Sequence, residues 1–365
     1  MLTEHAISGR SELRWRLCNL AASLTTIALA CSAYALMPYN QKQLSTRFSG
    51  AGLSFSGLEF LVLAALAYAV TVAVWHLSES QPGCAKSLRC WYVLAAFAQA
   101  PRRTFDAGLA PADRLALLAT LLKCFFGPLM GMSLMLFCVN AWVNGAQLMA
   151  GFAGADNWRD GLLLFNRHGY WFALQLLLFV DVLAFTLGYL VELPRLGNAI
   201  RSVDPTWLGW GAALLCYPPF NSLTNALLGS QLSEFPQFAN PTVHLLMNLL
   251  LLAAMAGYAA SSLALGLKAS NLTHRGIVAR GPYALVRHPA YVCKNLAWLI
   301  GSLPALFTAF GQSPLTGLQA LGSVLGWAAL YLLRALTEED HLRRVDGDYA
   351  AYAARVRYRF IPGLV

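Results

Sequence analysis

The chain has 365 residues, of which 58% are hydrophobic and only 12% charged, with a formal net charge of +9. Soluble domains carry about 25% charged residues, and a soluble fold of this length has no means of hiding so much apolar surface from water. The composition excludes an ordinary soluble protein and indicates an integral membrane protein. The positive charge does not indicate nucleic acid as a partner, because the basic residues lie in short segments between apolar runs and form no stripe with interleaved aromatic residues.

Apolar runs long enough to cross a bilayer begin near the N-terminus. Arginines precede the first run, and no small-residue cleavage motif ends it, so we expect a transmembrane helix there and not a removed signal peptide. The fifth run contains Pro218-Pro219, which breaks the helical hydrogen-bond pattern. The sequence therefore predicts an all-α polytopic bundle of about eight transmembrane helices in a lipid bilayer. The expected spans lie at about residues 17–37, 58–77, 115–140, 170–191, 207–228, 243–267, 291–310 and 317–336.

Lysine and arginine are distributed unevenly between the two sets of loops that eight spans would create. With the N-terminus inside, the opposite side keeps only Lys42, Arg47, Arg159 and Arg167. This bias predicts that both termini are cytoplasmic. We expect a multi-pass protein of a bacterial inner (cytoplasmic) membrane. The expected cytoplasmic side receives Lys86, Arg89, Arg102, Arg103, Arg114, Arg195, Arg201, Lys268, Arg275, Arg280, Arg287 and the basic C-terminal tail.

The loop at residues 230–241 has no lysine or arginine and contains two prolines. We interpret it as a soft boundary between two sections. Residues 1–235 form a front section of transmembrane helices to which no role is assigned. Residues 236–365 form a back section with three transmembrane helices and a cytoplasmic C-terminal segment.

Two features of the front section bear on function. Asp181 lies near the middle of the fourth span, where a carboxylate is either functional or paired structurally with a polar neighbour such as Asn221 or Asn225. Cys84 and Cys90 flank a short loop, but no histidine or further cysteine follows at metal-ligand spacing. The sequence predicts no metal site.

Two polar clusters bracket the last two spans, at residues 268–291 and 334–365. Because those spans form a hairpin, both clusters return to one membrane face, where they can build a pocket. Gly281-Pro282 is typical of a turn, and Pro289 is suited to the first position of a helix. Asp348 is placed to cap a final helix.

The string GPYALVRHPAY, followed by a hairpin and then by EEDHL, DYAAY and VRYRFIPGL, resembles the isoprenylcysteine carboxyl methyltransferase and phospholipid methyltransferase superfamily. The resemblance covers about residues 240–365. It implies a membrane methyltransferase without a Rossmann fold that binds S-adenosyl-L-methionine between its last helices and its C-terminal segment. Carried over by position, the cofactor-binding residues are Gly281, Tyr283, Arg287, His288, Pro289, Tyr291, Arg334, Glu338 and Glu339.

The resemblance implies catalytic roles for Arg287, His288 and Glu339. Glu338 or Glu339 suits the ammonium or sulfonium charge of the cofactor, and Arg287 or His288 suits its carboxylate. A carboxylate acceptor needs no base, whereas an amine or thiol acceptor would give its proton to His288 or to a glutamate. The expected acceptor is a hydrophobic or lipid-linked molecule at the cytoplasmic leaflet.

The chain departs from the family pattern in two places. Members often have glycine where this chain has Cys293, with Lys294 next, and an Asn-Pro pair common in the hairpin is absent, leaving only Pro304. Two other functions remain open. One is an NADPH-dependent membrane reductase of the sterol-reductase type, and the other is a transporter or non-catalytic membrane protein, which Asp181 and the broken fifth span would favour.

Overall fold

The computed structural model describes residues 9–50, 52–79, 83–229 and 237–364. The chain forms two compact units, residues 1–132 and residues 133–365. The predicted section boundary falls within the range of the second unit, and residues 235 and 236 both lie outside the described residues. The functional division at that point stays a prediction.

The first unit consists mainly of helices. Ser56 and Glu59 form a capping box at the start of α3, in which each side chain bonds the other residue's backbone N–H. The chain then passes into the 42-residue helix α6, which continues into the second unit. The elements of this part are α1 (Gly9–Leu36), η1 (Pro38–Asn40), α2 (Gln41–Ser45), β1 (Arg47–Gly50), β2 (Leu53–Ser56), α3 (Gly57–Ser78), α4 (Lys86–Gln99), α5 (Pro101–Ala107) and α6 (Pro111–Phe152).

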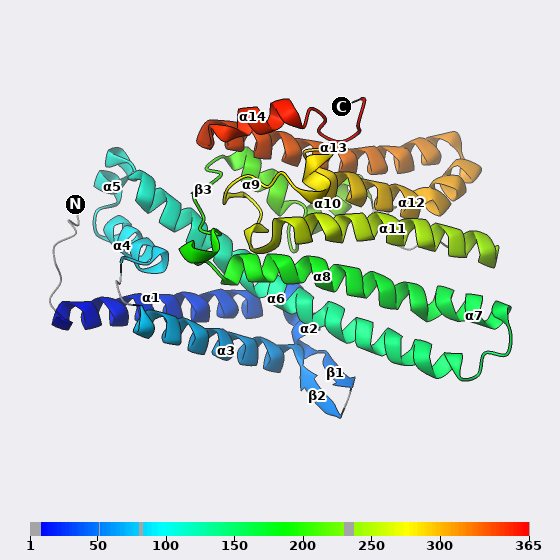
Figure 1. The fold of residues 1–365 in the computed structure, drawn as a ribbon, viewed down its shortest axis with the longest axis horizontal. Coiled ribbons are helices and arrows are strands. Elements are labelled where there is room, and N and C mark those ends of the chain that lie inside the picture. Colours follow the sequence, from blue (N-terminus) through cyan, green and yellow to red (C-terminus); the bar gives the residue numbers. More distant parts are fainter. Residues whose placement is uncertain (1–8, 51, 80–82, 230–236, 365) are drawn as a thin grey trace. The chain divides into compact units, whose positions relative to one another are not determined.

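In the second unit, α11, α12 and α13 run side by side, and α8 packs along α11 (Figure 1). A π-helical turn, Phe165–Gly169, joins α7 to α8. The elements are α7 (Trp158–Leu164), α8 (Tyr170–Leu190), η3 (Pro194–Leu196), β3 (Ser202–Val203), α9 (Trp207–Leu214), α10 (Asn221–Leu228), α11 (Pro241–Leu265), η4 (Gly266–Lys268), β4 (Thr273–His274), η5 (Gly281–Ala284), α12 (Pro289–Gln312), α13 (Pro314–Val345) and α14 (Asp348–Arg355).

Three long helices of this unit begin with proline directly after the N-cap position. Pro241, Pro289 and Pro314 occupy the first helical position, where no backbone N–H is needed. Asn240 and Ser313 cap two of these helices through their side chains. The prediction for Pro289 is confirmed. Asp348 lies in the first turn of α14, however, and Gly347 takes the N-cap position that we had expected Asp348 to hold.

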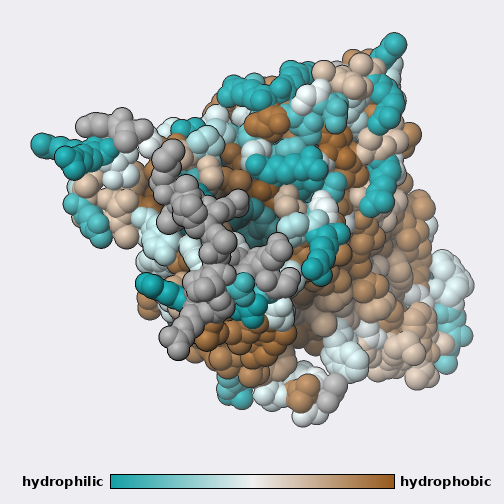
Figure 2. Space-filling view, turned by 60° about the vertical axis from the view of Figure 1, so that its left-hand side comes forward, coloured by the Kyte–Doolittle hydropathy of each residue, from teal (hydrophilic) through white to brown (hydrophobic). Residues whose placement is uncertain are grey.

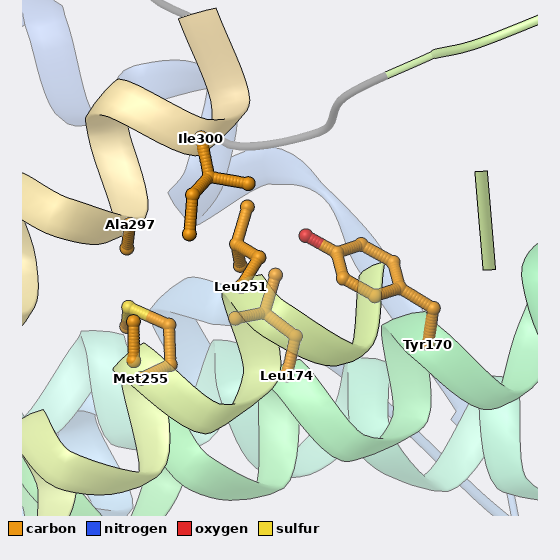
Figure 3. Close-up of a cluster of buried hydrophobic side chains, with 7 residues drawn as sticks. Tyr170, Leu174, Leu251, Met255, Ala297 and Ile300 are labelled. Atoms are coloured by element: carbon orange, nitrogen blue, oxygen red, sulfur yellow. The ribbon is translucent and has the colours of Figure 1, made fainter. Parts of the chain in front are cut away.

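The core of the second unit is apolar and is shared by three helices. Tyr170 and Leu174 of α8 pack against Leu251 and Met255 of α11, and α12 contributes Ile300 (Figure 3). On the face shown in Figure 2, hydrophilic residues gather in the upper part of the view and hydrophobic ones predominate lower down. Many large hydrophobic side chains of the long helices are exposed. This pattern matches a bundle whose helix sides face lipid.

The described residues contain seven helices that are long and apolar enough to cross a membrane. They correspond to seven of the eight expected spans, and the protein is an all-α polytopic membrane bundle. The expected fifth span is not a continuous helix. It folds as two eight-residue helices, α9 and α10, with a break at the Pro218–Pro219 peptide bond, which is cis. Seven of the expected spans are thus continuous helices, and the fifth is interrupted at the two prolines, as their position in the sequence indicated.

The segment that contains α9 and α10 nevertheless runs antiparallel to α13. Before α9, Ser202 bonds His341 near the end of α13 (3.0 Å). At the break, the ring of Tyr217 lies 5.8 Å from the Arg334 guanidinium. Leu228, at the end of α10, contacts α13 at Gly326. The backbone of the α9–α10 segment is thus irregular where the segment passes Arg334. This irregular backbone therefore lies against protein and not against lipid.

Candidate functional site

The first predicted motif folds as a short 3-10 helix followed by the start of α12. Gly281 has φ +57°, a conformation that L side chains rarely adopt, and it opens η5. His288 takes the N-cap position of α12, directly before Pro289. The motif thereby places Tyr283, Arg287 and His288 on one connection between α11 and α12.

The second motif forms the end of α13. Arg334 and Glu338 are one turn apart, with 3.8 Å between the guanidinium and the carboxylate. Arg334 is 4% exposed, and Glu339 is 1% exposed. These buried charges lie beyond the apolar part of the helix, close to the first motif.

Glu339 joins most of the basic groups in this region. Its carboxylate accepts hydrogen bonds from Arg287 (2.9 Å), Arg343 (2.8 Å) and Arg359 (3.1 Å), and His288 Nε2 lies 3.3 Å away. A buried carboxylate is stable when it is paired in this way. Because these four partners come from different segments, Glu339 connects the start of α12, α13 and the C-terminal segment.

The C-terminal segment runs along the first motif through backbone hydrogen bonds. The N–H groups of Arg287 and His288 donate to the carbonyls of Tyr358 and Arg359, both at 2.9 Å. The Arg287 side chain also donates to the carbonyl of Arg357 (3.0 Å). The segment after α14 is therefore fixed against the start of α12.

The two motifs converge on one cavity, whose empty volume is about 1320 Å³ when the open solvent at its mouth is included. The cavity is formed by the second unit alone, and its wall comes from the ends of α8, α11, α12 and α13, the 269–278 loop and α14. Of the nine predicted cofactor residues, Gly281, Pro289 and Glu339 do not line it. The other six do: Tyr283, Arg287, His288, Tyr291, Arg334 and Glu338.

Glu338 is the acidic residue of the predicted set that faces the cavity. The Tyr291 hydroxyl donates to its carboxylate, and His288 Nδ1 lies 3.8 Å away. The rings of His288 and Tyr291 are stacked, with centroids 5.5 Å apart. The Glu338 side chain remains 31% exposed, so its carboxylate is accessible to a ligand in the cavity.

Sequence reasoning missed Asn271, which connects the cavity wall. Its backbone N–H and its side-chain amide donate to the Tyr189 hydroxyl at 2.7 and 3.0 Å, and Arg334 donates to its side-chain oxygen at 2.8 Å. The amide also bonds the Tyr217 hydroxyl (3.2 Å). The only sequence signal was its place inside the first polar cluster, and nothing there singled it out.

The membrane-embedded end of the cavity holds a cation among aromatic rings. Lys294 Nζ lies 5.4 Å from the ring centre of Tyr258, 5.3 Å from Trp298 and 5.8 Å from Tyr331. Such distances are typical of cation–π contacts. Lys294 directly follows Cys293, the position at which the motif departs from the glycine of the family pattern.

Asp181 lies behind this end of the cavity. It is 4% exposed and accepts a hydrogen bond from Ser262 of α11, and Lys294 interacts with it electrostatically. The expected pairing with Asn221 or Asn225 was wrong, because α11, and not α10, packs against this face of α8. Whether Asp181 also acts on a ligand stays a prediction.

Three arginines of the wall keep donors available. Arg275, Arg287 and Arg334 each have a buried Nε with no hydrogen-bond partner among the described residues, and Arg275 also has a free Nη2. Leaving a buried donor unpaired costs about 1–3 kcal/mol. All three arginines line the cavity.

The tyrosines of the wall outside the spans are neutral donors. Burial raises the pKa of Tyr349 and Tyr352 to about 12 and raises that of Tyr283 as well. The Tyr352 hydroxyl donates to the backbone carbonyl of Tyr283 (3.0 Å). These groups are therefore not phenolate bases at neutral pH.

His274 closes the side of the cavity formed by the β3–β4 ladder. Burial lowers its pKa below the ordinary value, although Asp346, 2.9 Å from Nε2, works in the opposite direction. The loss of hydration outweighs the single carboxylate, and the neighbouring Arg201 and Lys268 further disfavour the imidazolium.

Comparison of the chain with models of known protein families, with curated proteins and with solved structures gave no match. The resemblance to membrane methyltransferases therefore stays a hypothesis that rests on the motifs themselves.

Proposed function

We propose that the protein is a membrane-embedded methyltransferase that uses S-adenosyl-L-methionine to methylate a hydrophobic or lipid-linked acceptor at the cytoplasmic leaflet. The observation that carries the proposal is the convergence of two motifs, about fifty residues apart, on one cavity. Six of the nine residues that the family resemblance implies as cofactor ligands line that cavity.

The charges of the wall complement the cofactor. S-adenosylmethionine carries a carboxylate, an ammonium and a sulfonium, and its sulfonium supplies an already activated methyl group. Glu338 is the accessible carboxylate for a positive group, and the aromatic rings of Tyr283 and Tyr291 suit a sulfonium. The unpaired donors of Arg275, Arg287 and Arg334 suit the carboxylate.

The residues of the cavity would contribute orientation and desolvation more than acid–base chemistry. Arg287 and Arg334 would hold anionic groups, and Glu338 would orient the cationic end of the cofactor. For an amine or thiol acceptor, Glu338 or His288 is placed to receive the proton. A carboxylate acceptor would need no base. Glu339, which we had expected in catalysis, would act by positioning Arg287 and His288.

The acceptor would reach the cavity from the membrane. The inner wall belongs to α8, α11, α12 and α13, four helices that are apolar enough to span a bilayer, and it includes Phe185, Leu265 and Tyr331. This wall favours an acceptor with an apolar portion. The basic residues around the cavity mouth favour the cytoplasmic side.

The test is cofactor binding measured by calorimetry on detergent-purified protein. Wild type should bind S-adenosylmethionine, and Glu338→Gln should weaken binding at least tenfold, about 1.4 kcal/mol. Asp340→Asn is the matched control, since Asp340 lies two residues further on α13, is exposed and pairs with Arg344. Its binding should equal that of wild type.

Titration with NADPH tests the reductase alternative in the same preparation. Folded wild-type protein that binds NADPH and not S-adenosylmethionine would overturn the methyltransferase proposal. Equal binding of S-adenosylmethionine by wild type and Glu338→Gln would show that the cofactor does not occupy this cavity.

A further inference from the structure

Three cationic side chains from separate segments converge beside the mouth of the cavity. A Cβ built on Gly276 would lie 3.1 Å from Lys268 Nζ and 3.5 Å from the guanidinium of Arg201. Arg280 is close enough to Lys268 to interact with it electrostatically, and both line a small hollow next to the main cavity. The three residues precede β3, end η4 and precede η5, so the fold, and not the local sequence, brings them together.

These three cations lack acidic partners. No carboxylate of the described residues forms an ion pair with Arg201, Lys268 or Arg280, and their mutual repulsion is uncompensated. Of the acidic groups in this region, Asp346 is bonded to His274, and Glu192 accepts a hydrogen bond from the backbone N–H of Ile200. A convergence of like charges costs free energy unless an anion offsets it.

Other basic residues of the same region each have at least one hydrogen-bond or ion-pair partner within the protein. Arg275 donates to the carbonyl of Asn198, and Arg334 donates to Asn271. Arg344 pairs with Asp340. General attraction to the membrane surface explains scattered basic residues, but it does not explain why Lys268 and Arg201, which have no acidic partner among the described residues, meet at Gly276 with Arg280 beside Lys268.

We propose that Arg201, Lys268 and Arg280 form a binding site for a phosphate group at the cavity mouth. Gly276 has φ +95° and carries no side chain, and a Cβ at this position would crowd Lys268 Nζ. Guanidinium and ammonium groups bind phosphate oxygens through charge-assisted hydrogen bonds. The chemical class is a phosphate ester, carried either by an anionic lipid headgroup or by a nucleotide.

The position of the site gives it a role. Lys268 lines both the small hollow and the main cavity, so a molecule whose phosphate is held there extends directly into the main cavity. The site would therefore select phosphorylated ligands for the cavity. Phosphate binding needs neither S-adenosylmethionine nor methyl transfer, so this inference stands apart from the proposed function.

The test is calorimetry on detergent-purified full-length protein without S-adenosylmethionine. The probes are a short-chain phosphatidic acid, inorganic phosphate, and NADPH compared with NADH. Wild type should bind at least one phosphate probe, and Arg201→Gln and Lys268→Gln should each weaken that binding at least tenfold. Phosphatidic acid alone would identify a lipid site, inorganic phosphate a simple anion site, and a preference for NADPH over NADH a nucleotide site.

Arg195→Gln is the matched control. Arg195 is also exposed and near the start of the same connection, and its replacement removes the same charge. The control should bind like wild type. Absence of binding by all probes to folded wild type, or equal weakening in Arg195→Gln and Arg201→Gln, would overturn the proposal. Because all three variants change exposed or half-exposed side chains, thermal unfolding should confirm that each is folded.

Discussion

Buried polar residues have different hydrogen-bond partners in the two compact units. In the first unit, Asn19 is 1% exposed and uses its side chain entirely on backbone, donating to Gly83 (2.7 Å) and accepting from Ala85 (3.0 Å). In the second unit, Asn271 bonds three side chains, those of Tyr189, Tyr217 and Arg334. Asn19 bonds the connection between α3 and α4 to α1, whereas Asn271 bonds side chains that line a cavity.

The same contrast applies to histidine. His76 of the first unit bonds Ser23, which also bonds Ser87, so these groups link α1, α3 and α4. His288 of the second unit lies between Glu338 and Glu339 at the surface of a cavity. Burial and hydrogen bonding are common to both units and so do not identify a site. What distinguishes the second unit is that its polar groups line a cavity.

The largest effect should come from removing the carboxylate that holds the second unit together. Glu339→Ala leaves three arginines without their shared partner, and breaking a buried ion pair from one side costs about 3–5 kcal/mol. We expect a greatly lowered unfolding temperature in detergent, or no folded protein. Asp340→Asn, next to it but exposed, should change stability by about 0–1 kcal/mol. Equal unfolding temperatures for the two variants would show that Glu339 does not stabilise the fold.

A matched pair of asparagine variants tests the contrast between the units. Asn19→Ala and Asn271→Ala should each cost about 1–3 kcal/mol, because buried partners lose their hydrogen bonds. Only Asn271→Ala should also weaken S-adenosylmethionine binding, since Arg334 and Tyr217 lose the group that positions them. The measurement is thermal unfolding together with calorimetric binding. If Asn19→Ala weakened cofactor binding to the same extent, the division of roles between the two units would be wrong.

Hydropathy and proline positions predicted most of the fold. Seven spans appear where apolar runs of about 20 residues required them, and Pro289 begins α12 as expected. The break in the fifth span was also foreseen from Pro218-Pro219, but its course along α13 was not. That course depends on distant contacts, such as Ser202 with His341, which leave no periodic signal in the sequence.

The sequence predicted the site in part. The hairpin argument brought the two motifs together, because connectivity alone returns both clusters to one face. Which of two adjacent glutamates faces the cavity depends on the rotation of α13, and Glu338 takes that position while Glu339 points toward the arginines. Asn271 and the convergence of Arg201 with Lys268 were missed, because loops that meet only in three dimensions carry no spacing rule.

The smallest effect should be a dependence of stability on acidity that is specific to the second unit. His274 has a lowered pKa in the folded state because it is buried, against about 6.5 when unfolded. Between those two values the unfolded chain binds more protons, so the stabilisation is complete above about pH 6.5 and is lost as the pH falls through the folded-state pKa. The unfolding temperature should therefore drop on acidification from pH 8 to pH 5, and His274→Gln should reduce that drop. Asp346→Asn should enlarge it, because Asp346 is the group that favours the imidazolium. If acidification raised the unfolding temperature of the wild type relative to that of His274→Gln, the effect of the Asp346 ion pair on the pKa of His274 would outweigh the effect of burial.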